Sequence, residues 1–196
     1  MKVKFRRSCQ DDLESVYELH TKCFASSDQW YKSNIKHYLD NGIIIELKNK
    51  LIGVLLQGPI TACNQKFNID ELDEQIHKVK SGYQEDIFEP INETGTLFLK
   101  NNIHFKELYG IVMICIQPEF RGKGLAKKLI DKHFQDTNNH NHSKVICLNT
   151  RKTNINAYLL YKKMGYQHIA YIKNKYFFPN EDSIFMIKDL SETTNN

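Results

Sequence analysis

The sequence predicts an α/β fold, and three observations support this prediction. Segments rich in β-branched residues alternate along the chain with segments whose apolar residues recur every three or four positions, as on one face of a helix. A strand pattern, a tight turn with glycines and a helix pattern follow one another at 109–136. The chain has 196 residues, which is enough for one domain with a substantial core. We therefore expect a single domain over 1–196.

The N-terminal third is predicted to hold a strand, two helices and a hairpin. Val3–Arg7 alternates apolar and charged residues, as a strand with one buried face does. Asp11 stands three residues before Glu14, which is the spacing of a helix capping box, and a first helix is expected there. A second helix is expected to begin near Asp28 and to place Tyr31 on its apolar face. The remaining features are a helix end at Gly42, strands at 43–47 and 51–57, and the polar turn 48–50 between these strands.

The rest of the chain repeats the strand and helix patterns after a long polar segment. Strands are expected at 109–117, 144–149, 168–172 and 184–187, and helices at 125–136 and 154–164. Residues 58–105, which prolines and glycines interrupt, are interpreted as an insertion, because a connection of this length in a compact domain is usually functional. Between Asn64 and Glu107, nine acidic residues stand against five lysines. This local excess of negative charge would attract a cationic substrate.

Composition argues against several classes of protein. The net charge is only +4, and no cluster of lysine and arginine interleaved with aromatics points to a nucleic-acid partner. No apolar stretch approaches the roughly 20 residues that span a bilayer. Since no secretory signal is apparent either, we expect a cytoplasmic or nuclear location. The five cysteines form no Cys-x-x-Cys pair, so we interpret them as reduced thiols and expect no metal.

The turn before the helix at 125–136 has the composition of a phosphate site. It reads Gln117-Pro118-Glu119-Phe120-Arg121-Gly122-Lys123-Gly124-Leu125-Ala126. Such a turn presents successive backbone N–H groups at a helix N-terminus, where the helix dipole adds positive potential. A side chain at Gly122 or Gly124 would block the close approach of a pyrophosphate, while Arg121 and Lys123 add positive charge. We therefore predict that this turn binds a phosphate group.

A second motif makes this interpretation more specific. Asn154, Ala157, Tyr161 and Gly165-Tyr166 follow about thirty residues later, in a helix that again comes after a strand. With Arg121-x-x-Gly124-x-Ala126, they resemble the two cofactor motifs of the GNAT superfamily of N-acetyltransferases. This resemblance implies a mostly antiparallel central sheet, flanked by helices, with a V-shaped splay between its two central strands. It also implies acetyl-CoA as the acetyl donor and a primary amine as the acceptor.

The resemblance also reaches segments outside these motifs and suggests an acceptor. Cys23-Phe24 with Trp30-Tyr31, and Tyr176-Phe177-Phe178-Pro179, are similar to segments of protein N-terminal acetyltransferases. It implies that Phe24, Tyr31 and Tyr176 line the slot for a protein or peptide N-terminus. For the cofactor, it implies main-chain contacts from Cys115 and Ile116 to the pantetheine arm, a pyrophosphate site at Arg121, Gly122, Lys123, Gly124, Leu125 and Ala126, a hydrogen bond from Asn154, and Tyr161 as the acid that protonates the leaving thiolate.

The general base is the point where the sequence departs from this family. The two strand positions that the resemblance assigns to a base are occupied by Gly110 and Asn149, and neither can accept a proton. Tyr109, Glu107 and His104 are the candidates to replace it. Tyr109 is one residue from Gly110, so strand alternation should turn it to the opposite face unless a bulge intervenes.

Two alternatives therefore stay open at the level of sequence. The acceptor could be a small amine, such as an arylalkylamine or a polyamine, with the insertion at 58–105 supplying the pocket. The chain could also bind acyl-CoA without turnover, because Gly110 and Asn149 leave no evident base. The oligomeric state is not predicted.

Overall fold

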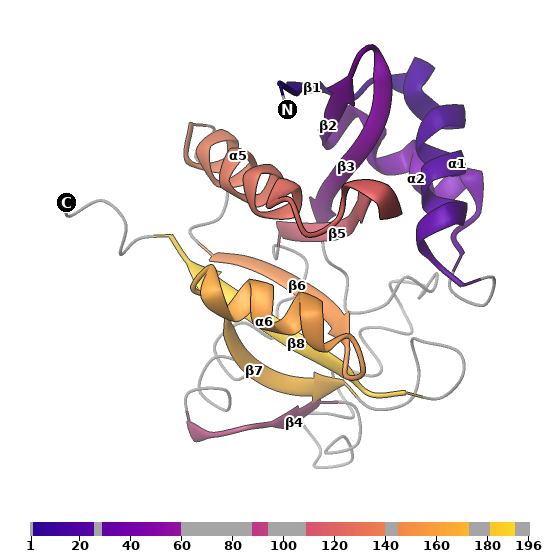
Figure 1. Ribbon diagram of the computed structural model, residues 1–196. Coiled ribbons are helices and arrows are strands. Elements are labelled where there is room, and N and C mark those ends of the chain that lie inside the picture. The colour runs from indigo at the N-terminus through magenta and orange to yellow at the C-terminus, as the bar shows by residue number, and fades with distance from the viewer. Residues whose placement is uncertain are drawn as a thin grey trace. The chain divides into compact units, whose positions relative to one another are not determined.

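The computed structural model describes residues 2–25, 29–59, 88–93, 109–139, 145–172 and 181–190. The chain divides into two compact units, which we describe separately (Figure 1). Unit 1 comprises Met1–Pro59, Tyr109–Lys144 and Thr193–Asn196, and unit 2 comprises Ile60–Leu108 and Val145–Glu192. Within the described ranges, no helix is long and apolar enough to cross a membrane. The cytoplasmic or nuclear location stays a prediction.

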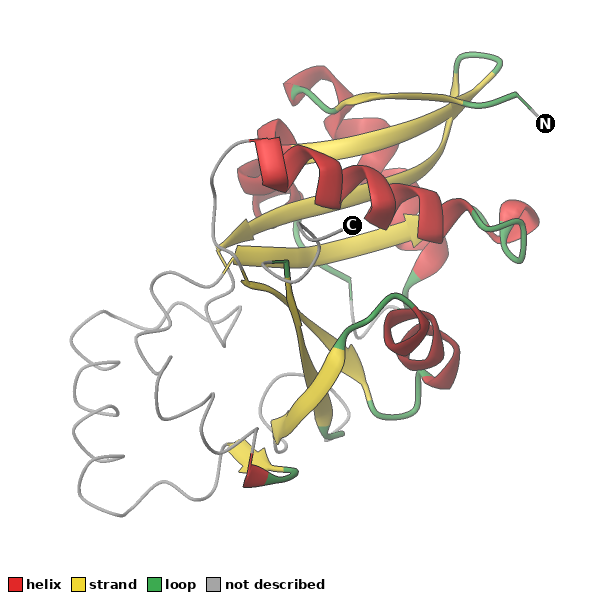
Figure 2. Cartoon of the chain, turned by 90° about the vertical axis from the view of Figure 1, so that its left-hand side faces the viewer, coloured by secondary structure: helices red, strands yellow, loops and turns green. Residues whose placement is uncertain are grey.

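Unit 1 is a four-stranded antiparallel sheet with helices on both faces. Its strand order is β1-β2-β3-β5. Figure 2 shows one helix, α5, in front of these strands and the helices α1 and α2 behind them. The elements are β1 (Lys4–Arg7), η1 (Gln10–Asp12), α1 (Leu13–Cys23), α2 (Lys32–Tyr38), η3 (Leu39–Asn41), β2 (Gly42–Leu47), β3 (Lys50–Pro59), β5 (Tyr109–Ile116), η5 (Pro118–Phe120) and α5 (Leu125–Asn139).

The core of unit 1 that lies under α1 and α2 is apolar. Val16 and Leu19 of α1 pack there with Ile35 of α2 against Met113 and Cys115 of β5. The helical spacing of Val16, Leu19 and His20 along α1 explains this packing, because residues three and four apart share a face. These contacts fix the C-terminal end of α1 beside the end of β5.

Two details of the N-terminal region differ from the sequence-based expectation. The capping box is formed by Cys9 and Asp12 rather than by Asp11 and Glu14: the Cys9 N–H donates to Asp12 Oδ2 at 2.9 Å. Tyr31 does not lie on the apolar face of α2, since 81% of it is exposed. It is the N-cap, with extended backbone (φ −67°, ψ 152°), so the helical periodicity does not reach it.

The strands of unit 1 confirm the predicted hairpin and reveal an irregularity in β5. The turn between β2 and β3 places Lys48 and Asn49 at φ of 50° and 60°, as a two-residue hairpin turn requires. Between β3 and β5 the register passes from Leu56↔Met113 to Gln57↔Ile111. Val112 is therefore the extra residue of a β-bulge in β5.

Unit 2 is also built on antiparallel strands. Its elements are β4 (Phe88–Pro90), β6 (Val145–Arg151), α6 (Ile155–Lys163), β7 (Gln167–Ile172) and β8 (Ser183–Asp189), with the strand order β6-β8-β7-β4. Figure 1 shows α6 lying across β6 and β8. The strand β4 lies in the segment 58–105 that we interpreted as an insertion, and it pairs with β7.

The α/β class and the antiparallel character of the strands are confirmed within each unit. The predicted splay concerns β5 and β6, which belong to different units, so it stays a prediction. Apart from 58–59 and 88–93, the predicted insertion at 58–105 lies outside the described residues, and so do Tyr176, His104 and Glu107.

Candidate functional site

The turn between β5 and α5 has the backbone of an anion-binding loop. After β5 ends at Ile116, η5 makes one tight turn, and the chain then reaches Gly122 and Gly124 before α5 begins at Leu125. Both glycines have positive φ, at 72° and 73°, a backbone conformation that residues other than glycine rarely adopt. A Cβ atom on either would meet nothing within 4 Å. The glycines are thus required by backbone conformation, and the space above them is open.

The surroundings of this loop favour a negative ligand. Arg121 and Lys123 are exposed, and the Lys123 ammonium donates to the Glu119 carbonyl at 2.9 Å while it lies 4.9 Å from the centre of the Phe120 ring. The first backbone N–H groups of a helix have no partner within the helix, and they lie at the positive end of its dipole. Leu125 anchors this end of α5, because only 2% of it is exposed.

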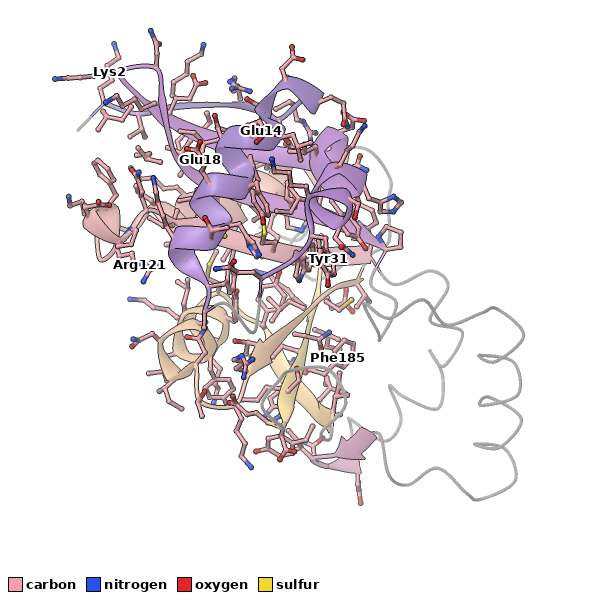
Figure 3. The ribbon with its side chains drawn as sticks, turned by 90° about the vertical axis from the view of Figure 1, so that its right-hand side faces the viewer. Lys2, Glu14, Glu18, Tyr31, Arg121 and Phe185 are labelled. Carbon is pink, nitrogen blue, oxygen red and sulfur yellow. The ribbon has the colours of Figure 1, made fainter. Side chains whose placement is uncertain are left out.

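Arg121 connects the loop to β5 and α1. Its Nε donates to the main-chain carbonyl of Ile116 at 3.1 Å. The thiol of Cys23, the last residue of α1, donates to the same carbonyl oxygen at 3.4 Å. Figure 3 shows Arg121 near the end of α1 that carries Cys23. Three elements of unit 1 therefore meet at the Ile116 carbonyl.

The cysteine beside the Ile116 carbonyl, Cys23, has a lowered pKa. The pKa of Cys23 is lowered to about 6, first by a hydrogen bond from the Cys115 thiol and then by the Arg121 guanidinium, against the effect of burial. Burial raises the pKa of Cys115 well above its ordinary value, and the hydrogen bond to Cys23 adds to this. Sequence reasoning missed this pair, because we had interpreted the five cysteines only as reduced thiols.

An aromatic cluster joins α1 to α2 on the same side of the sheet. His20 is almost fully buried, and its Nε2 accepts from the Trp30 main-chain N–H at 2.8 Å. Its ring centre lies 4.7 Å from that of Phe24 and 6.2 Å from that of Trp30. Burial lowers the pKa of His20, so this ring is neutral and holds the link between the helices. Of the predicted acceptor residues, Phe24 belongs to this cluster and Tyr31 is exposed.

Tyr109 lies on the other face of the sheet from α2. A Cβ atom on Gly58 would lie 2.6 Å from the Tyr38 ring, so this position points toward α2. Gly110 pairs with Gly58 and shares its face, whereas the neighbouring Tyr109 points the other way. The bulge at Val112 does not change this, because Tyr109 and Gly110 both precede it. Burial raises the pKa of Tyr109, and the nearby Arg7 guanidinium partly opposes this.

The second cofactor motif lies in unit 2. The side chain of Asn154 is the N-cap of α6, and its Oδ1 accepts from the Ala157 N–H at 3.3 Å. Tyr161 is 5% exposed, and its ring centre lies 5.7 Å from that of Tyr166. In β6, the buried Oδ1 of Asn149 has no hydrogen-bond partner among the described residues.

The structure thus assembles the predicted site residues in two groups. Unit 1 brings together the main chain of β5 at Cys115 and Ile116, the loop from Arg121 to Ala126, and Phe24. Unit 2 holds Asn154 and Tyr161 on one helix. The first group has the geometry to bind a phosphate, and the second offers an amide and a phenol.

Comparison with known proteins adds a family and a fold. The acetyltransferase (GNAT) family matches residues 13–166. An N-alpha-acetyltransferase of Saccharolobus solfataricus is 29% identical over 80 residues, which make up 41% of this chain and 47% of that protein. The matching part therefore spans about half the length of this relative.

Several solved structures share the fold at low sequence identity. A ribosomal-protein-S18-alanine N-acetyltransferase from Escherichia coli has a TM-score of 0.66 and 13% identity, over 96% of this chain and 94% of that one. Arylalkylamine N-acetyltransferase 2 from Aedes aegypti has a TM-score of 0.64 and 17% identity, over 97% and 100%. NAA60 from Arabidopsis thaliana in complex with acetyl-CoA has a TM-score of 0.66 and 16% identity, over 96% and 99%.

Proposed function

The chain belongs to the acetyltransferase (GNAT) family, and from this membership we propose that it transfers the acetyl group of acetyl-CoA to a primary amine. The turn between β5 and α5 is the observation that carries the proposal. Its two positive-φ glycines leave open space in front of the N-terminus of a fifteen-residue helix, where a pyrophosphate would fit. The family match includes this turn as well as Asn154 and Tyr161.

In this proposal, acetyl-CoA is bound by main-chain groups and by two side chains. The N–H groups from Gly122 to Ala126, with Arg121, hold the pyrophosphate, and the main chain of Cys115 and Ile116 aligns the pantetheine arm. Asn154 uses its amide nitrogen, because its Oδ1 already caps α6. When bound, acetyl-CoA supplies an activated acetyl thioester. The Tyr161 phenol donates the proton that the leaving sulfur needs.

We propose a protein or peptide N-terminus as the acceptor. The relative from Saccharolobus solfataricus, an N-alpha-acetyltransferase, supports this choice. The aromatic cluster of His20, Phe24 and Trp30 gives the region between α1 and α2 a firm apolar base, and the exposed Tyr31 beside it is free to contact an extended peptide. Tyr176 is proposed to complete the slot.

The amine must be neutral when it attacks, because an ammonium nitrogen has no lone pair. Tyr109 is our candidate for the group that accepts its proton. Because the Tyr109 side chain points away from α2, water must relay the proton to it, and Tyr109→Phe tests this role. We expect kcat to fall by about tenfold or more and the acidic limb of its pH profile, along which the rate rises as the base loses its proton, to change. An unchanged pH profile would mean that solvent, rather than Tyr109, accepts the proton of the amine.

A non-catalytic acyl-CoA-binding module is the second candidate. It is favoured by Gly110 and Asn149, which stand at the two positions where the family resemblance expects a base. A small-amine acetyltransferase is an alternative within the first class, since an arylalkylamine enzyme has the same fold.

One assay separates these candidates. The purified chain is given acetyl-CoA and one of three acceptor sets: peptides with free N-termini, the same peptides with blocked N-termini but free lysines, or arylalkylamines and polyamines. Release of CoA thiol is followed, and mass spectrometry locates the acetyl group. We expect transfer to the free N-termini only. Turnover on small amines alone would replace the proposed acceptor, and tight binding of acetyl-CoA without turnover on any amine would favour the binding module.

A further inference from the structure

Two charged side chains from one segment of unit 2 bind the two ends of α6. The segment consists of β8 and the two residues before it, and it contributes Glu181 at the N-terminal end of α6 and Lys188 at the C-terminal end. Figure 1 shows α6 lying across this strand. Since α6 carries both Asn154 and Tyr161, the two contacts hold the helix of the second cofactor motif.

Glu181 binds the chain immediately before Asn154. Its Oε1 accepts from the Thr153 main-chain N–H at 2.6 Å, and its Oε2 accepts from Arg151 Nη1 at 2.7 Å. The Asn154 N–H closes this turn by donating to the Arg151 carbonyl at 3.0 Å. The side chain of Asn154 is held as well, because its Oδ1 accepts from the Ala157 N–H. The carboxylate of Glu181 therefore fixes the turn that places Asn154.

Lys188 binds the other end of the helix. Its ammonium donates to the Met164 carbonyl at 2.6 Å, and the last carbonyl groups of a helix have no partner within the helix. The carbonyl of Tyr161, one turn earlier, accepts from the N–H groups of Met164 and Tyr166, each at 3.0 Å. The contact from Lys188 therefore fixes the turn of α6 that carries the Tyr161 phenol.

The charges and the strand both suit this arrangement. The N-terminus of a helix is positive and its C-terminus negative, so a carboxylate at the first and an ammonium at the second are both favourable. The strand β8 is paired on both sides, with β6 and with β7. Its bonding to the chain after β6 continues at the Lys152 N–H, which donates to the Asp182 carbonyl at 3.1 Å. Glu181 thus directly precedes an ordered strand, and Lys188 lies within it.

We propose that Glu181 and Lys188 are positioning residues for the acetyl transfer, and that each acts through a different residue of α6. Glu181 places Asn154 for its hydrogen bond to acetyl-CoA, and Lys188 places the Tyr161 phenol for its proton transfer to the leaving sulfur. This inference rests on the proposed function. Its consequence is that the two ends of one helix control different quantities: the N-terminal contact controls the affinity for acetyl-CoA, and the C-terminal contact controls kcat.

The experiment measures the Kd of acetyl-CoA by calorimetry, and kcat at saturating acetyl-CoA with a peptide that has a free N-terminus. Glu181→Ala should raise the Kd about fivefold, which corresponds to one lost hydrogen bond, and should leave kcat within about twofold of the parent. Lys188→Met should lower kcat about tenfold and leave the Kd within about twofold. Urea unfolding of each variant measures stability. A merely structural role would lower the stability without separating Kd from kcat.

Conservative variants test the two contacts themselves. Glu181→Gln keeps an oxygen that can accept from the Thr153 N–H, so it should restore the parent affinity. Lys188→Arg keeps a cationic donor for the Met164 carbonyl, so it should restore most of kcat.

Two further variants are matched controls for charge. Asp182→Ala removes the carboxylate next to Glu181, whose side chain pairs with Lys152 at 3.4 Å. Lys163→Met removes an exposed ammonium from the last turn of α6. Both should match the parent in Kd and in kcat.

The outcomes separate this inference from the proposed function. An unchanged Kd in Glu181→Ala, or an unchanged kcat in Lys188→Met, would overturn the role of that residue. Equal losses of affinity and kcat, or losses that the conservative variants do not restore, would do the same. A parent that does not bind acetyl-CoA would refute the proposed function instead. A parent that binds it without turnover on any amine would refute that function together with the role of Lys188, and the Kd of Glu181→Ala would still decide the role of Glu181.

Discussion

Arg121 donates from Nε to the Ile116 carbonyl at 3.1 Å, so the first residue of the phosphate loop is bonded to the last residue of β5. The same guanidinium lowers the pKa of Cys23. The Arg121 side chain thus links the loop to β5 and lowers the pKa of Cys23, so its replacement should affect the loop, the strand and the thiol.

Arg121→Gln should therefore raise the pKa of Cys23 from about 6 toward its ordinary value. The variant loses the charge and the hydrogen bonds that favour the thiolate, although the hydrogen bond from Cys115 remains. The rate of Cys23 alkylation between pH 5 and 9, followed by peptide mass spectrometry, measures this pKa. Lys123→Gln, which removes a neighbouring charge that does not act on Cys23, is the control. Identical midpoints in the parent and Arg121→Gln would show that Arg121 does not stabilise the thiolate.

Gly124→Trp should abolish acetyl-CoA binding, because the side chain enters the open space in front of α5. The positive φ of Gly124 adds a strain of about 1–2 kcal/mol to the folded state, so a modest loss of stability should accompany the effect. Calorimetry measures the affinity and urea unfolding the stability. Asn49→Ala is the control. Asn49 has a positive φ of 60° in the turn between β2 and β3, so the variant also strains the backbone, but it should bind acetyl-CoA normally. Unaltered affinity in a folded Gly124→Trp would mean that phosphate binds elsewhere.

Tyr161→Phe should lower kcat by about 10²–10⁴-fold with little change in acetyl-CoA affinity, as expected when a general acid is lost. The ring and its contact with Tyr166 are retained, so the fold should be unaffected. Tyr158→Phe is the matched control on the same helix, because its ring packs against His168. If the two variants turned over equally fast, Tyr161 would be a packing residue.

The elements set by local sequence could be predicted well. Gly122 and Gly124 predicted the position of the loop between β5 and α5, and the polar turn at Lys48-Asn49 predicted the position of the β2–β3 hairpin. Both depend on backbone preferences of single residues, which the sequence displays directly. The prediction for Tyr31 was wrong because helical periodicity was extended one residue beyond the start of α2.

Features that depend on distant contacts could not be predicted. Cys23 and Ile116 are 93 residues apart, and nothing in either segment indicates that they meet. The bulge at Val112 is set by register against β3, and β4 is a three-residue strand with a proline that gains its order from pairing with β7. The general base is a different case. The sequence already showed that Gly110 and Asn149 occupy the two positions expected to hold a base, and the structure adds only the face of the sheet on which Tyr109 lies.

The stability of unit 1 should fall as the pH drops, because His133 of α5 is buried and neutral. Its pKa is lowered to about 4, chiefly by burial and further by the Arg7 guanidinium, although the nearby Asp136 carboxylate opposes this. Arg7 and Asp136 themselves form an ion pair at 3.2 Å. An unfolded chain would protonate this histidine near pH 6.5.

The sign follows from the two pKa values. Since the folded pKa lies below the unfolded one, the contribution of His133 is complete above pH 6.5 and is lost progressively down to about pH 4. Between pH 7 and 5 the parent should lose about 2 kcal/mol more stability than His133→Phe, in which the ring stays but no proton binds. Urea unfolding at pH 7, 6 and 5 measures the difference. His20, whose pKa is also lowered by burial, is present in both proteins and contributes equally to the two slopes. Equal slopes for the parent and His133→Phe would show that His133 does not stay neutral in the fold.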